Sequence, residues 1–447
     1  MKKLNTLLLS GLVALAVAGC QSKTGENQQE ATQNEAASET GNISSAADSL
    51  PAPFATEPTA KISKVIGWPA NKTPTAPAGF VVSKFAAELQ NPRWIYVAPN
   101  GDILVSEANS APRLKEKVKA QLNGKAKSQN MGESADRITL FRDADKDGKP
   151  EVRTVFLEDL NQPLGMLILN NYFYVANTDG LWRYPYQDGQ TKIAGKGEKI
   201  LELPAGGYNN HWTRNIIANA DGSKIYISVG SGSNVGENGM EHEVKRANIL
   251  EVNPDGTGER IYASGLRNPV GMDWAPGTNT LWTAVNERDN LGDDLVPDYI
   301  TSVKEGAFYG WPYSYYGQHE DPRMKGQKPD LVKKAIAPDV PLGSHTASLG
   351  LAFYDQKAFP AKYQNGAFVG QHGSWNRSEL VGYKVVFVPF ANGKPSGKPE
   401  DFLTGFVSDL GKGEVYGRPV GVTVIPDGSL LVTDDASNTI WQVKAGK

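Results

Sequence analysis

The chain has 447 residues, of which 39% are hydrophobic and 21% are charged, so it contains enough apolar residues for a large packed core. Its 46 basic and 49 acidic residues leave a net charge of −3, which gives no electrostatic basis for a nucleic-acid partner. The 47 glycines and 28 prolines favour many short strands joined by turns over long helices.

The first twenty residues have the pattern of an export signal. Two lysines at positions 2 and 3 precede an apolar stretch from Leu7 to Val17, and the sequence VAGC ends at Cys20. This stretch is shorter than the ~20 residues that a membrane-spanning helix needs. We therefore expect residues 1–19 to be a cleaved lipoprotein signal peptide.

Cys20 is the only cysteine of the chain, so a disulfide within the chain is impossible and we expect Cys20 to be lipidated. A chance cysteine in an ordinary signal peptide is the alternative. The protein would then be exported and lipid-anchored to the bacterial cell envelope, facing the periplasm. Gln21, where Asp would indicate inner-membrane retention, favours the outer membrane.

The next segment is polar. Residues 21 to about 60 are rich in Gln, Glu, Ala, Ser, Thr and Asn, and the first aromatic residue is Phe54. Such a segment cannot bury enough apolar surface to order itself. We expect the lipidated cysteine and a flexible, disordered linker over residues 20–60, followed by one folded domain over residues 75–447.

A repeated unit fills the rest of the chain. It consists of an apolar strand, a turn containing Pro, Asp, Asn or Gly, and a second strand rich in β-branched and aromatic residues. Its copies begin at Pro92, Pro163, Trp212, Pro269, Ser348 and Pro419. Further strands follow several copies, such as RITLFRD and TIWQVK. Alternation with period two gives each strand one face toward each neighbouring unit.

The length of each unit leaves room for four strands, and repeated four-stranded units are typical of propeller blades. The sequence therefore predicts an all-β fold, a six-bladed β-propeller with four-stranded antiparallel blades. A strand near Gly79–Phe85 would complete the last blade. A β-sandwich with a second domain is the alternative.

His211 is a candidate for acid–base chemistry among only five histidines. It lies in GYNNHWTRN, immediately before the first strand of the third repeat, and this position faces the channel mouth in a propeller. A histidine there can take up a proton near neutral pH, as general-base catalysis requires. The alternative is a histidine that is hydrogen-bonded into a loop.

Arginines recur at the same point of other repeats. Arg267 lies in SGLRNPVG and Arg418 lies in VYGRPVG, while Arg93 and Arg214 have comparable positions. Because a ring would gather them around one space, we expect several guanidinium groups to converge without matching carboxylates. Such a cluster favours a small anionic ligand. A surface ion pair is the alternative for any single arginine.

Two acidic segments offer the oxygen ligands that calcium prefers. The first is NERDNLGDDLVPDYI at residues 286–300, for which a polar loop with capping aspartates is the alternative. Its candidate metal ligands include Asp289, Asn290 and Asp293. The second, DADKDG at residues 143–148, repeats the start of a calcium loop, but Thr154 stands at position twelve instead of Glu. A calcium-stabilised turn and a solvated turn both stay open there.

Other chemistries lack their motifs in this sequence. It contains no G-x-S-x-G elbow, no H-E-x-x-H and no Walker loop. It has no cysteine cluster for zinc or iron–sulfur and no C-x-x-C-H for covalent haem.

Several motifs together resemble one known family. They are GLRNPVGMDW at 265–274, the acidic segment at 286–300 followed by GAFYGWPY at 306–313, GQHGSWNRS at 370–378, and GRPVG at 417–421. The sequence over roughly residues 75–445 resembles the sorbosone dehydrogenase family, which is similar to the soluble PQQ-dependent glucose and aldose sugar dehydrogenases.

The resemblance implies roles for individual residues. His211 corresponds to the base that takes the proton of the substrate hydroxyl, and Arg267 corresponds to the arginine that contacts the quinone. Positions at or near cofactor contacts are Gln162, Arg214, Asn268, His372, Arg377 and Arg418. The loop whose backbone carbonyls hold calcium maps near Asp289 and Asn290. The glucose dehydrogenases have Asp directly before the base, whereas this chain has Asn210.

The implied function is the PQQ-dependent oxidation of an aldose or a related, sorbosone-like sugar aldehyde, with calcium beside the PQQ. The cofactor would accept the hydride while His211 removes the proton. Partners would be a small sugar and an external electron acceptor, with membrane contact only through the lipid anchor. A non-catalytic propeller that binds carbohydrate or protein, and a calcium-dependent lactonase-type propeller, stay open as alternatives.

Overall fold

The computed structural model describes residues 50–110, 128, 133–145 and 147–446. The chain divides into two units, Met1–Thr40 and Gly41–Lys447, and only the second contains described residues. The predicted signal peptide at 1–19 and Cys20 lie outside the described residues. In the described part of the chain, no helix combines the length and the apolar character that crossing a bilayer requires.

Six antiparallel sheets with four or five strands each make up most of the described residues. The first contains β3 (Pro92–Val97), β4 (Ile103–Glu107), β5 (Arg137–Arg142) and β6 (Val152–Leu157). The second contains β7 (Met166–Leu169), β8 (Tyr172–Asn177), β9 (Gly180–Pro185) and β10 (Glu198–Glu202). The third contains β11 (Arg214–Ala218), β12 (Ile225–Val229), β13 (Asn248–Val252) and β14 (Arg260–Ser264).

The fourth sheet contains β15 (Pro269–Trp274), β16 (Leu281–Val285), β17 (Pro297–Ser302) and β20 (Val340–Ser344). The fifth contains β21 (Ser348–Tyr354), β22 (Gly366–Gln371), β23 (Lys384–Ala391), β24 (Lys394–Pro395) and β25 (Glu400–Leu403). The sixth contains β28 (Pro419–Val424), β29 (Leu430–Asp434), β30 (Thr439–Ala445) and β2 (Phe80–Ala86).

Shorter elements decorate these sheets. They are β1 (Lys64–Val65), β26 (Val407–Asp409) and β27 (Glu414–Val415) in one small sheet, the hairpin of β18 (Ser314–Tyr315) and β19 (His319–Glu320), the helix α2 (Pro329–Val332), and the 3₁₀ turns η3 (Met240–His242) and η4 (Ala361–Tyr363). Every repeat predicted from the sequence coincides with the first two strands of one large sheet.

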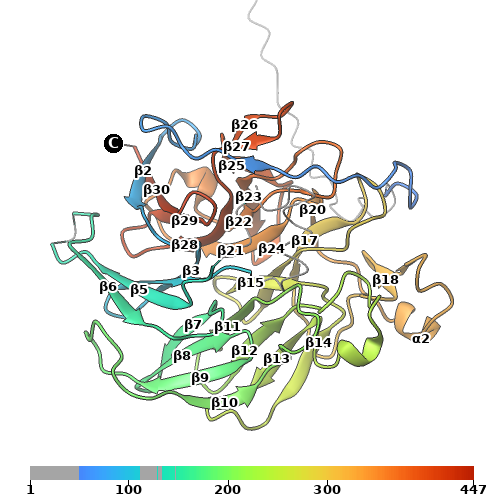
Figure 1. Cartoon of the computed structure of the whole chain (residues 1–447), viewed down its shortest axis with the longest axis horizontal. Coiled ribbons are helices and arrows are strands. Elements are labelled where there is room, and N and C mark those ends of the chain that lie inside the picture. Colours follow the sequence, from blue (N-terminus) through green and yellow to red (C-terminus); the bar gives the residue numbers. More distant parts are fainter. Residues whose placement is uncertain (1–49, 111–127, 129–132, 146, 447) are drawn as a thin grey trace, which may run out of the picture. The chain divides into compact units, whose positions relative to one another are not determined.

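The sixth sheet joins the two ends of the domain. β2 pairs antiparallel with β30, so a strand from the start of the domain completes the sheet formed by its end. Figure 1 shows this pair, with blue β2 beside red β30. The strand predicted near Gly79–Phe85 is therefore confirmed in both position and role.

The hydrophobic core lies between successive sheets. On β8, Phe173 and Val175 pack in one buried cluster with strands of the first sheet, whereas Tyr174 and Ala176 pack in another with the third sheet. Each further pair of neighbouring sheets shares a buried cluster, and one cluster joins the sixth sheet to the first. Because successive side chains of a strand point to opposite faces, one strand contributes to two hydrophobic clusters, as the sequence predicts. The architecture is consistent with a propeller.

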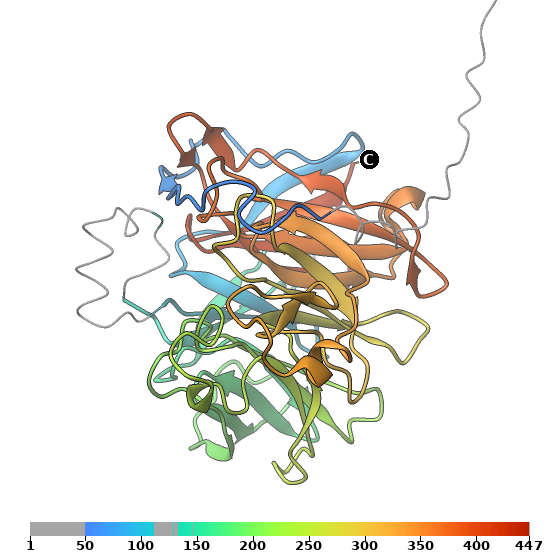
Figure 2. The same ribbon diagram turned by 90° about the vertical axis from the view of Figure 1, so that its right-hand side faces the viewer.

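A segment ahead of the first large sheet lies along loops that are distant in sequence. Phe54 N donates to Leu291 O (2.7 Å), and Lys61 N donates to Trp375 O (2.9 Å). Figure 2 shows this blue segment against red C-terminal strands, and β1 pairs in parallel with β27. The predicted linker boundary at residue 60 falls inside this bonded segment.

Candidate active site

Glycines bring the first strands of the sheets into close contact. A Cβ on Gly350 would lie 2.2 Å from Val420 O, and a Cβ on Gly421 would lie 2.7 Å from Arg93 O. No side chain fits at such distances, so each strand can approach the backbone of the next one. At other junctions Gly165 and Gly271 have the same role.

These first strands surround one channel. A cavity of about 470 Å³ is lined by residues of all six strands, such as Val97, Leu167 and Trp274, and by residues just past the ends of three of them, Pro276, Gln356 and Pro426. The residues immediately before the strands therefore gather at the opposite end of the channel. His211, Arg267 and Arg418 all belong to this second group.

Two contacts of its ring fix the orientation of His211. Its Nδ1 lies 2.8 Å from Ser231 O and 3.0 Å from Ser231 Oγ. A backbone carbonyl can only accept a hydrogen bond, so Nδ1 carries the proton and donates it. The lone pair is then on Nε2, which is the atom available to act as a base.

The surroundings of His211 also keep its ring neutral. Burial lowers its pKa well below the usual value, and the positive charge of Arg267 lowers it further. Around neutral pH the imidazole therefore holds its lone pair in almost every molecule. Asn210 Nδ2 donates to Tyr208 Oη (3.0 Å).

Arg267 is fully engaged by the protein. Its Nε donates to Asn234 O, its Nη1 donates to the carbonyls of residues 286 and 287, and its Nη2 donates to Asn234 Oδ1 and Asp289 Oδ2. These bonds use all five N–H groups of the guanidinium. The side chain is thus a rigidly held positive charge next to His211.

Asn234 connects Arg267 with the acidic loop. Its Oδ1 accepts from Arg267 and from the backbone N–H of Asp289, while its Nδ2 donates to Asp289 O (3.1 Å). Asp289 also lies 3.4 Å from His345 Nδ1. Burial alone would raise the pKa of Asp289, but His345 and Arg267 hold it below its usual value.

A second buried cluster surrounds Arg418. Its Nε donates to His372 O and its Nη2 donates to Gly373 O, each at 3.0 Å. The His372 ring lies 2.8 Å from Asp435 Oδ1, and Asp435 Oδ2 accepts from Arg93 Nη1. Burial and the charge of Arg418 lower the pKa of His372 to about 4. Burial alone would raise the pKa of Asp435, but His372 and Arg93 hold it well below its usual range.

The Arg93 guanidinium lies over the Trp212 ring, 5.4 Å from its centroid, and Trp212 follows His211 in the chain. The two clusters are therefore linked at one end of the channel. The expectation that the arginines lack matching carboxylates is wrong for Arg93 and Arg267, because Asp435 and Asp289 pair with them. Burial in a medium of low dielectric makes such counter-charges necessary.

Other predicted cofactor residues have different surroundings. Arg214 is buried and donates to four acceptors, three of them backbone carbonyls, and burial together with nearby Arg246 lowers its pKa to about 9. Gln162 Nε2 donates to Asn109 O. Arg377 contacts Asp294 on an outer loop, at 2.8 Å. Asn268 lies beside His211, and its buried Oδ1 has no hydrogen-bond donor among the described residues.

The predicted metal ligands of the acidic loop have protein partners. Asp289 contacts Arg267 and His345, and Asn290 Oδ1 accepts from Asn376. The carboxylate of Asp293 accepts from the backbone N–H and the hydroxyl of Ser378. Metal binding by these side chains stays a prediction that their contacts do not support.

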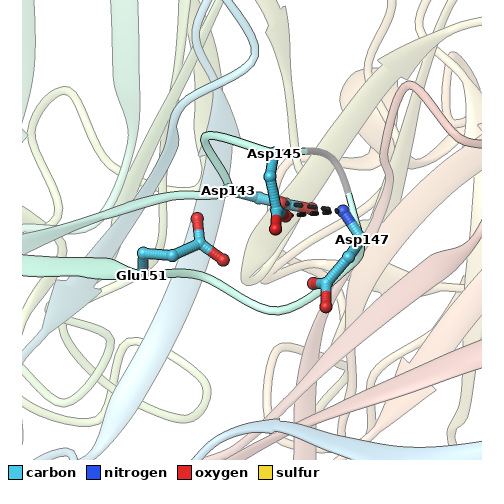
Figure 3. A group of neighbouring side chains, drawn as sticks. All are labelled: Asp143, Asp145, Asp147 and Glu151. Atoms are coloured by element: carbon cyan, nitrogen blue, oxygen red, sulfur yellow. Dashed lines mark hydrogen bonds between the residues drawn. The ribbon is translucent and has the colours of Figure 1, made fainter.

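Carboxylates converge in the other acidic segment. Ligand oxygens of Asp143, Asp145, Asp147 and Glu151 lie within 4.8 Å of one another, as Figure 3 shows for the four side chains. This is the one group of three or more potential metal ligands found in the described part of the chain. The carboxylates of Asp143 and Asp145 already accept the backbone N–H of Asp147.

Comparison with known proteins gives a family and a fold. Residues 70–442 match the family described as "Domain of unknown function (DUF7133)". The chain belongs to this family. An uncharacterized protein of Borreliella burgdorferi is 32% identical over 295 residues, which cover 64% of this chain and 76% of that protein.

Named relatives of this family member are sugar dehydrogenases. Aldose sugar dehydrogenase YliI of Escherichia coli is 29% identical over 194 residues, covering 43% of this chain and 46% of the relative. The holo form of the pyranose dehydrogenase PQQ domain from Coprinopsis cinerea has a TM-score of 0.66 at 20% identity, covering 86% of this chain and all of that one. The resemblance predicted from the motifs, to PQQ-dependent aldose and glucose dehydrogenases, is confirmed.

Proposed function

We propose that this protein is a PQQ-dependent dehydrogenase of an aldose or a related, sorbosone-like sugar aldehyde, built on a six-bladed propeller. The sugar dehydrogenases among its relatives support the general class. One observation carries the proposal: a neutral histidine with a free Nε2 lies beside buried cationic side chains at one end of a channel. A proton acceptor and an anion site are what this reaction requires.

The donor set fits PQQ at the Arg418 cluster. PQQ carries three carboxylates, and Arg93 Nη2 and Arg418 Nη1 make no hydrogen bond among the described residues. Planar guanidinium groups suit carboxylates, and both arginines are buried. The orphaned Oδ1 of Asn268 offers an acceptor for a ligand hydroxyl next to His211.

The roles of the chain's residues follow from these contacts. Bound PQQ would supply the two-electron acceptor. His211 Nε2 would take the hydroxyl proton of the sugar, while Ser231 holds the opposite side of the ring. Arg267 has no free N–H, so it would act through its charge and keep His211 neutral. The side chains of Asp289 and Asp293 already have protein partners, so they do not fit as side-chain ligands of calcium.

The test is reconstitution. Purified protein is mixed with PQQ, with and without calcium, and dye reduction is followed with a panel of aldoses and sugar aldehydes. We expect turnover with the wild type, loss of at least ~100-fold in kcat for His211→Gln, and full activity for the control His242→Gln, an exposed histidine. PQQ binding without turnover would favour a non-catalytic propeller. Acidification of a lactone solution with calcium alone would favour a lactonase.

We also propose that the protein is exported and lipid-anchored through Cys20, with its folded domain facing the periplasm and the outer membrane favoured. The support is the sequence pattern that ends at Cys20. Metabolic labelling with a fatty acid tests this, since the wild type should incorporate label and Cys20→Ser should not. Label in Cys20→Ser would contradict the proposal.

A further inference from the structure

Glu243 lies behind the turn that holds His211. It directly follows the 3₁₀ turn η3 and is buried. Its Oε2 accepts the backbone N–H of Gly232 (2.7 Å), and its Oε1 accepts the hydroxyl of Ser233. One buried carboxylate therefore binds two consecutive residues of the turn at 231–233, and bonds to a charged acceptor are strong.

The other side of the same turn faces both predicted catalytic residues. Ser231 O accepts from His211 Nδ1, and the N–H of Ser231 donates to Arg267 O (2.8 Å). The Ser231 hydroxyl donates to Ser233 O (2.6 Å), which closes the turn on itself. The direction of one peptide carbonyl, Ser231 C=O, thus decides which nitrogen of His211 carries the proton.

Within the described part of the chain, the turn makes two further hydrogen bonds. They run from Asn210 N to Gly232 O (3.1 Å) and from Gly236 N to Ser233 Oγ (3.0 Å). A Cβ on Gly232 would lie 2.7 Å from Tyr208 O, so the peptide is closely packed between that loop and Glu243. Among the described residues, the side chain of Glu243 is the one carboxylate that hydrogen-bonds to these three residues.

We propose that Glu243 is a positioning residue that acts through the 231–233 turn to keep His211 in the tautomer with Nδ1 protonated and Nε2 free. The kinetic consequence rests on the proposed function, whereas the tautomer itself is a property of the protein without cofactor.

The experiment reads the tautomer directly. Long-range ¹⁵N–¹H correlation spectra of the ¹⁵N-labelled, cofactor-free protein report which ring nitrogen is protonated. The chain has only five histidines, and His211→Gln assigns the signal. The variant is Glu243→Gln, which keeps the size of the side chain. Its amide NH₂ would face one of the two donors that the carboxylate now accepts from, the N–H of Gly232 or the hydroxyl of Ser233. Glu237→Gln is the matched control, because Glu237 binds the N–H groups of Asn234 and Val235 in the same segment.

We expect a protonated Nδ1 in the wild type and in Glu237→Gln, and a mixture with the Nε2-protonated form in Glu243→Gln. Ser231→Ala should keep the wild-type tautomer, since it retains the carbonyl. A single Nδ1-protonated signal in folded Glu243→Gln would overturn the proposal. If that variant does not fold, Ser233→Ala removes only one of the two bonds to the carboxylate and is read in the same way.

Kinetics give the second readout. With PQQ present, Glu243→Gln should lower kcat about tenfold or more, because part of the protein would carry His211 with its proton on Nε2, where it cannot act as a base. The KM for the sugar and the affinity for PQQ should change less than about twofold. A rise in KM at unchanged kcat would overturn the positioning role. If the wild type oxidises no sugar, the proposed function fails, and the tautomer result still decides the role of Glu243.

Discussion

Asp435→Asn tests the electrostatic basis of the Arg418 cluster. The carboxylate accepts from two buried partners, Arg93 and His372, whose side chains are only 10% and 8% exposed. A hydrogen bond to a charged group contributes ~1.5–3 kcal/mol, and breaking a buried ion pair by removing one partner costs ~3–5 kcal/mol. We therefore expect the free energy of unfolding to fall by about 3–5 kcal/mol.

The assay is urea unfolding at pH 7, followed by tryptophan fluorescence. Asp401→Asn is the matched control, because the ion pair of Asp401 with Lys384 is 58% and 30% exposed and should contribute at most about 1 kcal/mol. Equal losses in the two variants would refute the view that Asp435 neutralises a buried cation. The order of the two losses follows from burial alone, since both changes are isosteric.

Three further predictions follow from other contacts. Gly350→Ala should lower the free energy of unfolding by at least ~1–3 kcal/mol, because its Cβ would lie 2.2 Å from Val420 O. The control Gly206→Ala, whose Cβ would have no atom within 4 Å, should leave the free energy of unfolding unchanged in the same urea assay. The free energy of unfolding should fall as the pH drops from 6.5 toward 4. In this range His372 takes up a proton in the unfolded chain, whereas in the folded protein its pKa is about 4 and the ring stays neutral. The variant His372→Asn should therefore show a weaker pH dependence in thermal unfolding scans. Arg267→Met should raise the pKa of His211 and move the acidic limb of the kcat/KM profile to higher pH; an unmoved limb would contradict the role of that charge.

The repeat pattern predicted the fold because each repeat can be recognised within one short stretch of the sequence. An apolar strand, a turn residue and a second strand recur six times, and each recurrence became the first two strands of a sheet. The closing strand β2 was also predictable, since an apolar run stands shortly ahead of the first repeat. The bonded segment around Phe54 and Lys61 was not, because main-chain bonds to distant loops leave no pattern in a polar sequence.

The sequence showed which titratable residues stand just ahead of the first strands, and it did not show their hydrogen-bond partners. His211, Arg267 and Arg418 each stand one to three residues ahead of the first strand of a repeat, and their roles toward a cofactor stay predictions. Asp435 directly follows the second strand of the last repeat, β29, in the sequence TDD, and this acidic pair was a readable signal for a buried carboxylate. Ser231, Asn234 and Glu243 act through hydrogen bonds across sequence gaps, and nothing in their spacing indicates this.

Hydrogen bonding separates the arginines into two kinds. Arg267 uses all five N–H groups within the protein, so a ligand could bind it only by displacing bonds already made. Arg418 and Arg93 each keep a guanidinium nitrogen with no such bond among the described residues. Substitutions at Arg418 should therefore weaken PQQ affinity, whereas substitutions at Arg267 should act on the protonation of His211. Direct binding measurements on Arg418→Met and Arg267→Met decide this, and equal loss of affinity in both would show that Arg267 also contacts the ligand.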